Sequence, residues 1–347
     1  MPAIAEPSIE HLYDIAEALC RRRVDAVVHA GGGGHSRIYR VDSGGDCFAL
    51  KVYPPRGQDP RDRLGTEVKA LRFLEAQGVK LVPRVLAADA ERGFALLEWI
   101  AGAAVIEVGP AEIDAAVAFL GDVRDLGAAA GAEAMPLASE ACLSGAEIVR
   151  QVETRKARLL QLSAREPELA AFLDDEFAPA LAEIHTWARD GYAAAGIDFA
   201  AELAPHLRTL IPADFGFHNA LRRPDGSLAF VDFEYFGWDD PVKAAADFLL
   251  HPAMTLAEEM KRRFGAGMCD RFAHDTTFVA RLRTLFALFG MRWCLILLNE
   301  FLPERWAQRA FAGGQGDWRG AKMRQLHRSR QALGTLRATY RDFAYGN

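Results

Sequence analysis

The sequence predicts an α+β protein of two lobes: a small β-rich lobe over residues 1–98 and a large, mostly helical lobe over residues 99–347. Three observations support this prediction. The chain of 347 residues is longer than a single hydrophobic core usually requires. Up to residue 98, short apolar runs flank glycine-containing turns, a pattern typical of β-hairpins. From Pro110 onward the chain is rich in alanine and shows helical periodicity.

In the first lobe, residues 8–22 carry apolar residues at helical spacing. The segment SRIYRVDSGGDCFALKVYP (36–54) predicts two strands around a Gly-Gly turn. Residues 61–79 return to helical spacing and end near a glycine. Residues 84–100 again indicate strand, turn and strand. We therefore expect a small sheet with at least one helix.

The second lobe is expected to consist mainly of helices. Their approximate ranges are 111–130, 143–163, 166–194, 241–250, 255–273, 275–300 and 318–344. Residues 210–233 are the exception, because the loop ADFGFHNAL precedes LRRPDGSLAFVDF, which reads as a hairpin on a Pro-Asp-Gly turn. The large lobe is therefore expected to carry one strand–loop–hairpin insert.

Composition limits the classes of function. Half of the residues are hydrophobic and 25% are charged, as in soluble globular proteins. A net charge of −6 argues against a general nucleic-acid binder. The five cysteines include no C-x-x-C pair and are expected to be reduced. The N-terminus lacks the features of a signal peptide. The apolar stretch 284–299 is too short for a membrane span and is interrupted by Arg292, so we expect it to form a buried helix. We expect a cytoplasmic protein that binds neither nucleic acid nor membrane.

A glycine-rich segment, HAGGGGHSRIYRV, lies before the first predicted hairpin. Its glycines, Gly31, Gly32, Gly33 and Gly34, would let backbone N–H groups approach phosphate oxygens. No Lys-Ser/Thr pair follows, so it is not a Walker A loop, and no strand–loop–helix context supports a dinucleotide fingerprint. A plain flexible turn is the alternative interpretation.

Lys51 lies among apolar residues on the second strand of that hairpin. A lone lysine on such a strand is usually an edge residue, or one whose apolar stem lies along the surface while its ammonium group reaches water. Glu67, sixteen positions later on the next predicted helix, could instead hold Lys51 upright against nucleotide phosphates. A strand lysine paired with a helix glutamate after a glycine-rich hairpin is the protein-kinase arrangement.

The loop ADFGFHNAL carries the most specific spacing. Asp214 and Asn219 are five residues apart, as are the base and the Mg²⁺-binding asparagine of a kinase catalytic loop. Asp232 ends a hydrophobic strand thirteen residues after Asn219, where a second metal-binding carboxylate is required. Each aspartate alone could be a turn cap, but the ordered set favours phosphoryl transfer.

With these motifs, the chain resembles the aminoglycoside phosphotransferase and choline kinase superfamily, whose fold is protein-kinase-like. The segments GGGGHSRIYRV, FALKVY, LLEWIAG, ADFGFHNAL and VDFEYFGWDDP carry the resemblance, which spans about residues 25–300. It implies transfer of the γ-phosphoryl group of ATP to a small-molecule hydroxyl.

The resemblance also implies roles for individual residues. Asp214 would be the catalytic base, and Asn219 and Asp232 would hold Mg²⁺. Lys51 would contact the ATP phosphates, and Glu67 would position Lys51. Ser36 and the Gly31–Gly34 backbone would cover the ATP phosphates, and the adenine would bind the backbone near Glu98 and Ile100. Asp240 and Asp247 match an acidic support region of the family only loosely.

One departure from the family pattern is Pro212, which stands where the family usually has a histidine that braces the catalytic loop. A nucleotide-binding pseudokinase or regulatory module is therefore an alternative. A protein kinase is disfavoured because no APE-like activation segment is present. His218, next to Asn219, is expected to pack or hydrogen-bond within the loop rather than to act as an acid or base.

Charge distribution bears on the acceptor. Residues 233–347 contain 17 Lys/Arg against 12 Asp/Glu, whereas residues 1–232 contain 24 against 35. A polycationic acceptor requires a carboxylate-rich pocket. We therefore expect a neutral or anionic acceptor, a sugar or sugar derivative, with aminoglycosides and amino alcohols as the alternative. Arg292, which interrupts an apolar helix, could contact the acceptor or form an internal ion pair.

Overall fold

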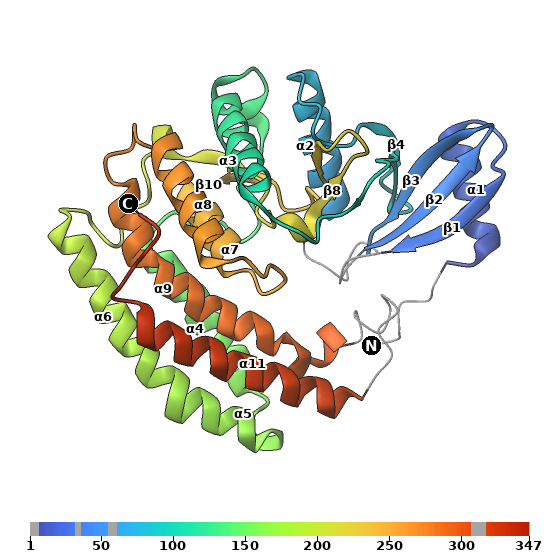
Figure 1. Cartoon of the computed structure of the whole chain (residues 1–347). Helices are drawn as coiled ribbons and strands as arrows, with labels where there is room; N and C mark the ends of the chain where they lie inside the picture. Colours follow the sequence, from blue (N-terminus) through green and yellow to red (C-terminus); the bar gives the residue numbers. More distant parts are fainter. Residues whose placement is uncertain (1–6, 32–35, 55–60, 307–316, 347) are drawn as a thin grey trace.

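The computed structural model describes residues 7–31, 36–54, 61–306 and 317–346 (Figure 1). A small antiparallel sheet with its helices lies at one side, and a larger helical region makes up the rest of the molecule. The α+β fold class expected from the sequence is confirmed.

The small sheet contains five strands in the order β1-β2-β3-β5-β4, and neighbouring strands are antiparallel. The chain enters it through helix α1 (Ile9–Cys20). The strands are β1 (Ala26–Gly31), β2 (Arg37–Ser43), β3 (Asp46–Val52), β4 (Val85–Asp89) and β5 (Phe94–Glu98), and helix α2 (Arg63–Ala76) connects β3 to β4. Strand β1, whose last residue is Gly31, was not predicted from the sequence.

Alternation along β3 decides where Lys51 points. Leu50 and Val52 pack in an apolar cluster with α1. Successive side chains of a strand point to opposite faces, so Lys51 points to the other face of the sheet, where α2 lies. This alternation brings the lysine to Glu67 of α2.

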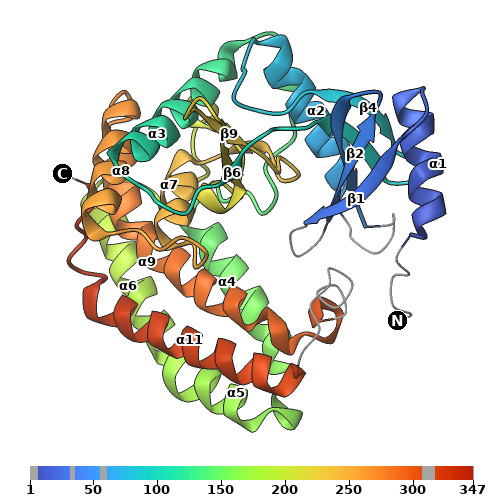
Figure 2. The ribbon, with the colours of Figure 1, turned by 45° about the vertical axis from the view of Figure 1, so that its right-hand side comes forward.

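The helical region is built around α9. Its main helices are α3 (Pro110–Asp125), α4 (Gly145–Leu160), α6 (Ala178–Ala194), α7 (Pro241–Leu250), α8 (Glu258–Arg271), α9 (Phe278–Leu297) and α11 (Trp318–Thr339). Helix α9 packs against α4, α6, α7 and α11, and Figure 2 shows α9 and α11 running side by side. In place of the single helix expected over 166–194, α5 (Pro167–Ala171) continues through a wider π-helical turn, Phe172–Phe177, into α6.

Among the described residues, one helical span, Phe278–Phe301, is long and apolar enough to cross a membrane, but 67% of its apolar window is buried inside the protein. The expectation of a buried helix at 284–299 is therefore confirmed.

Short strands frame the loop of interest. Strand β7 (Thr209–Ile211) pairs with β10 (Gly237–Asp239), and β8 (Ala220–Arg222) lies between β6 (Ala103–Ala104) and β9 (Leu228–Phe230). The β8–β9 pair is the hairpin that the Pro-Asp-Gly turn predicted. These strands fix both ends of the segments that carry Asp214 and Asp232.

Candidate active site

Lys51 is the centre of a buried cluster of charges. Its ammonium nitrogen lies 2.5 Å from Glu67 Oε2 and 2.6 Å from Asp232 Oδ1. The lysine and Glu67 side chains are only 3% and 1% exposed. Burial lowers the pKa of Lys51, but the carboxylates of Asp232 and Glu67 raise it well above the ordinary value. Lys51 is therefore charged at neutral pH.

Glu67 connects three segments that are far apart in the chain. Its Oε2 accepts hydrogen bonds from Lys51 and from the Tyr53 hydroxyl, at 2.7 Å for the tyrosine. Its Oε1 accepts from the Phe233 backbone N–H at 3.2 Å. Strand β3, helix α2 and the segment after β9 are thereby held together. The contact between Lys51 and Glu67 is the one that the sequence predicts, and their roles stay predictions.

Carboxylates gather around Asp232. Oxygen atoms of Glu67, Asp232 and Glu234 lie within 4.8 Å of one another, close enough to hold a metal ion. Asp232 is the accessible member, with 23% of its side chain exposed. Burial and the charge of Asp232 raise the pKa of Glu234, which also pairs with Arg63. Glu234 was not among the residues singled out in the sequence; its position two residues after Asp232 was the available signal.

The backbone is strained at two points of the site. Ala213 and Asp232 have φ angles of 66° and 70°, in the left-handed region that residues other than glycine rarely adopt. Such a conformation costs about 1–3 kcal/mol and persists only where surrounding contacts enforce it. Here the Val231 N–H donates to the Asn219 backbone oxygen at 2.9 Å, which fixes the residue before Asp232.

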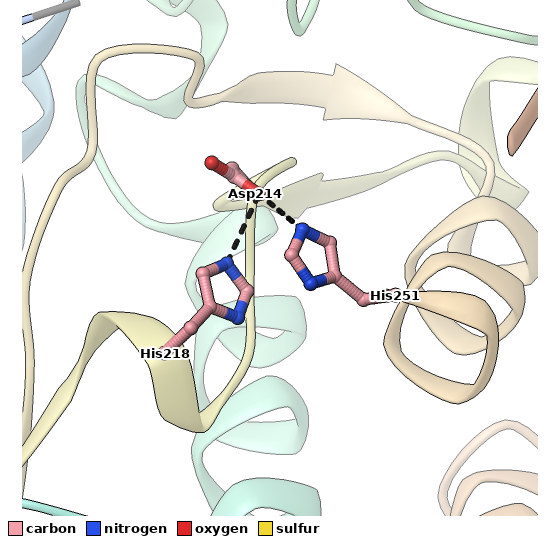
Figure 3. Close-up of side chains that lie close together, drawn as sticks. All are labelled: Asp214, His218 and His251. Atoms are coloured by element: carbon pink, nitrogen blue, oxygen red, sulfur yellow. Dashed lines mark hydrogen bonds and ion pairs between the residues drawn. The ribbon is translucent and has the colours of Figure 1, made fainter. Parts of the chain in front are cut away.

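Figure 3 shows Asp214 flanked by two imidazole rings, His218 from the short 3₁₀ turn before β8 and His251 at the end of α7. Their Nε2 atoms lie 3.2 Å and 3.7 Å from Asp214 Oδ1. The two rings stack in parallel with centroids 3.9 Å apart. His218 thus hydrogen-bonds within the loop, as expected. Although Pro212 replaces the usual bracing histidine, two other histidines contact the carboxylate.

Charge around Asp214 favours its ionised form. Burial raises the pKa of Asp214, but the His218 hydrogen bond and the neighbouring His251 and Lys243 lower it below the ordinary value. Burial, together with His218, lowers the pKa of His251 to about 4. Asp214 is therefore a carboxylate beside a neutral His251 at neutral pH.

Packing explains why the loop ADFGFHNAL contains two phenylalanines and a glycine. Phe215 and Phe217 are buried, and the Phe215 ring lies 4.8 Å from Phe230 and 5.9 Å from Phe248. A Cβ on Gly216 would come within 2.7 Å of both the His218 ring and the Met254 sulfur. The two phenylalanines anchor the loop, and the glycine leaves room for His218.

The other predicted site residues are placed as follows. The Asn219 side-chain N–H donates to the Asp214 backbone oxygen at 2.9 Å, which leaves its amide oxygen available. Ser36 is buried next to the start of β2, and Gly31 ends β1. Glu98 pairs with Arg84, and Ile100 is buried just after β5. Gly32, Gly33 and Gly34 lie outside the described residues.

The two aspartates of the loosely matched acidic region form internal ion pairs. Asp240 pairs with Arg281, and Asp247 pairs with Arg292 at 2.5 Å. Arg292 also lies 3.2 Å from Gln151 Oε1. The internal ion pair that the sequence left open for Arg292 is therefore present, although its side chain also lines the cavity described next.

A cavity of about 170 Å³ opens beside Asp214. A second cavity of about 340 Å³ shares Ile296, Asn299 and Arg305 with it, so the two adjoin. Lys51, Glu67 and Asp232 are not among the lining residues of either cavity. Asp214 thus lines a cavity that these three residues of the Lys51 cluster do not line.

Comparison with known proteins shows the family of the chain. A family model described as the phosphotransferase enzyme family, APH, matches residues 26–275. The chain belongs to this phosphotransferase family. The resemblance to the aminoglycoside phosphotransferase and choline kinase superfamily is thereby confirmed, as is the expectation of a small-molecule kinase. A search of curated proteins finds no match.

Solved phosphotransferases and kinases share the fold. The ADP-bound aminoglycoside phosphotransferase APH(2'')-Ib is similar with a TM-score of 0.60 and 16% identity, over 95% of this chain and 99% of that one. Choline kinase LicA from Streptococcus pneumoniae gives 0.58 and 15%, over 94% and 99%. An ethanolamine kinase from Plasmodium vivax gives 0.60 and 12%, over 95% and 92%. At these identities the likeness concerns the fold.

Proposed function

We propose that the protein transfers the γ-phosphoryl group of ATP, with Mg²⁺, to a hydroxyl group of a sugar or sugar derivative. The observation that carries this proposal is the contact of Lys51 with both Glu67 and Asp232, at 2.5 Å and 2.6 Å. Asp232 lies 181 residues from Lys51 in the chain. Phosphoryl transfer needs a phosphate-binding lysine, its positioning glutamate and a metal-binding aspartate in one place.

The residues present fit Mg²⁺. The partly exposed Asp232 carboxylate and the available amide oxygen of Asn219 are the oxygen ligands that Mg²⁺ prefers. Lys51 neutralises only part of the charge of Glu67 and Asp232, and the remaining negative charge suits a divalent cation. When bound, Mg²⁺ would neutralise charge on the phosphate oxygens.

Asp214 is the proposed base. It would accept the proton of the acceptor hydroxyl, and the contacts from His218 and His251 hold its carboxylate toward the cavity. This bracing argues against the pseudokinase alternative, because it replaces the contact that Pro212 cannot make.

A screen of hydroxyl-bearing metabolites for acceptor-dependent ADP release would test the proposal. We expect Mg²⁺-dependent ADP release with one or more sugars or sugar derivatives. ADP release only with choline, ethanolamine or aminoglycosides would support the alternative acceptor class. Nucleotide binding without turnover of any acceptor, and without slow ATP hydrolysis, would support the pseudokinase.

A further inference from the structure

A third cavity, larger than the two described above, lies next to them. Its volume is about 600 Å³. It shares Trp293 with the cavity beside Asp214 and His251, Pro252, Leu297 and Arg328 with the second cavity. His251 also contacts Asp214, at 3.7 Å. This large cavity therefore adjoins the space in which the acceptor hydroxyl would meet the proposed base.

One face of α9 lines the large cavity. Its residues there are Phe286, Gly290, Trp293 and Leu297, whose helical spacing places them on one side of the helix. Phe286, Trp293 and Leu297 are partly exposed, whereas most of this apolar helix is buried against its neighbours. Helix α9 thus presents a face of large apolar side chains to a cavity and not to another helix.

The opposite walls are also mainly apolar. Helix α11, which runs beside α9 in Figure 2, and the chain from the end of α7 toward α8 form them. Their apolar side chains are Leu249, Leu250, Met254, Leu256, Ala332 and Leu336. Glu258 and Lys261 of the wall pair with each other at 2.7 Å. The large cavity therefore suits an apolar group better than a charged one.

Aromatic rings bound the end of the large cavity that is remote from Leu297. Phe286 lies about 16 Å from Leu297 along the helix axis. Its ring centre is 5.3 Å from that of Phe343 and 5.6 Å from that of Tyr345, and both of these residues line the cavity. The Tyr345 hydroxyl donates to Glu258 Oε2 at 3.0 Å. The cavity thus adjoins the proposed acceptor site at one end and meets an aromatic cluster at the other.

We propose that the large cavity binds an apolar group, alkyl or aryl, of the acceptor whose hydroxyl is phosphorylated at Asp214. The inference rests on the proposed function and makes the acceptor an amphiphile, a sugar or sugar derivative with an apolar substituent. Such a group would cover the partly exposed side chains of Phe286, Trp293 and Leu297, and burial of apolar surface favours binding. Cavities of this size with apolar and aromatic walls are typical small-molecule sites.

A second copy of the chain is the alternative occupant, because apolar surfaces also mark protein interfaces. The position of the cavity favours the acceptor. Residues that line it, His251 and Trp293, also line the cavities next to Asp214. A group attached to the acceptor could reach it from there, and this continuity has no bearing on an interface between copies.

The first test is turnover on acceptors that differ only in their apolar group. The panel comprises glucose, galactose, mannose and N-acetylglucosamine, each as the free sugar and as its methyl, butyl and octyl glycosides. Each methylene group that becomes buried should raise kcat/KM about fourfold, so we expect the octyl glycoside of a phosphorylated sugar to exceed its methyl glycoside by about 100-fold or more. Equal kcat/KM along the series would overturn the proposal and would leave the proposed function standing.

Variants of α11 test whether the large cavity causes this preference. Thr335 lines the cavity and is exposed, so Thr335→Trp places a bulky side chain there without entering the core. Ala338→Trp is the matched control, because Ala338 is exposed on the same helix and does not line the cavity. The ratio of kcat/KM for octyl over methyl glycoside should fall at least about 10-fold in Thr335→Trp and stay within about twofold of wild type in Ala338→Trp. An unchanged ratio in Thr335→Trp would refute the assignment of the cavity.

A binding measurement needs no turnover. N-phenyl-1-naphthylamine, a neutral dye that fluoresces in apolar surroundings, should bind the wild type and Ala338→Trp and be displaced by octyl glucoside but not by methyl glucoside. Thr335→Trp should bind the dye at least about 10-fold more weakly. No saturable binding to the wild type, or equal binding by all three proteins, would refute the apolar site.

Sedimentation velocity in the same buffer tests the alternative occupant. We expect Thr335→Trp to keep the oligomeric state of the wild type. A wild-type dimer that this substitution converts to a monomer would assign the cavity to an interface between copies and overturn the proposal. If slow Mg²⁺-dependent ATP hydrolysis persists in that case, the proposed function stands and this inference alone fails.

Discussion

Replacing Glu67 by glutamine should weaken both the fold and the activity. The carboxylate accepts three hydrogen bonds, two on Oε2 from Lys51 and Tyr53 and one on Oε1 from the Phe233 N–H. In glutamine an NH₂ group replaces one of the two carboxylate oxygens. That NH₂ donor would then face either Lys51 and Tyr53 or the Phe233 N–H, all of which are donors themselves. Breaking a buried ion pair costs about 3–5 kcal/mol. Because Lys51 keeps Asp232, we expect Glu67→Gln to lower the free energy of unfolding by about 3 kcal/mol.

The same change should displace Lys51 from its position between the two carboxylates. A displacement of about 1 Å can cost about 100-fold in rate, so we expect kcat/KM to fall by about that factor. Urea unfolding followed by circular dichroism, together with steady-state ADP release, would measure both effects. Glu75→Gln, an identical substitution at an exposed position of α2, is the control and should change neither quantity. Wild-type stability and turnover in Glu67→Gln would refute the reasoning.

Two further predictions concern Asp232 and His251. Mg²⁺ with ATP at 100 times its Kd should stabilise the wild type by about 2.7 kcal/mol, and Asp232→Ala should abolish this Mg²⁺-dependent rise in Tm; equal protection of both proteins would contradict the metal role. The pKa of His251 falls from 6.5 to about 4 on folding, because burial disfavours the charged imidazole. The contribution of neutral His251 to the free energy of unfolding is therefore complete above pH 6.5 and is lost as the pH falls toward 4. This loss amounts to about 3 kcal/mol, and His251→Asn should remove it from urea unfolding compared at pH 7.5 and 4.5; an unchanged pH dependence would contradict the assignment.

The sequence predicted contacts that depend on regular local structure. Lys51 on a strand and Glu67 on the following helix meet because β3 alternates and α2 packs on the same face of the sheet. The β8–β9 hairpin followed from its Pro-Asp-Gly turn, and α7 from the helical periodicity of the alanine-rich chain. The binding and catalytic roles of these residues stay predictions.

Other features depend on packing between distant segments. His251 reaches Asp214 only because α7 ends beside the loop, and nothing in the spacing of the two residues indicates this contact. Arg61 and Arg305 line one cavity although they are far apart in the chain. Strands β6, β7 and β10 contain only two or three residues, too few for a periodic signal.

The most direct test of the account is the effect of Asp214→Asn on phosphoryl transfer and on ATP binding in the same preparation. The amide keeps the shape of the side chain but cannot accept the proton of the acceptor hydroxyl. We expect kcat to fall about 100- to 10,000-fold, as for loss of a general base, while the Kd for Mg²⁺-bound ATP stays within about twofold. Turnover near that of the wild type would contradict the assignment of Asp214 as the base, and with it the proposed mechanism.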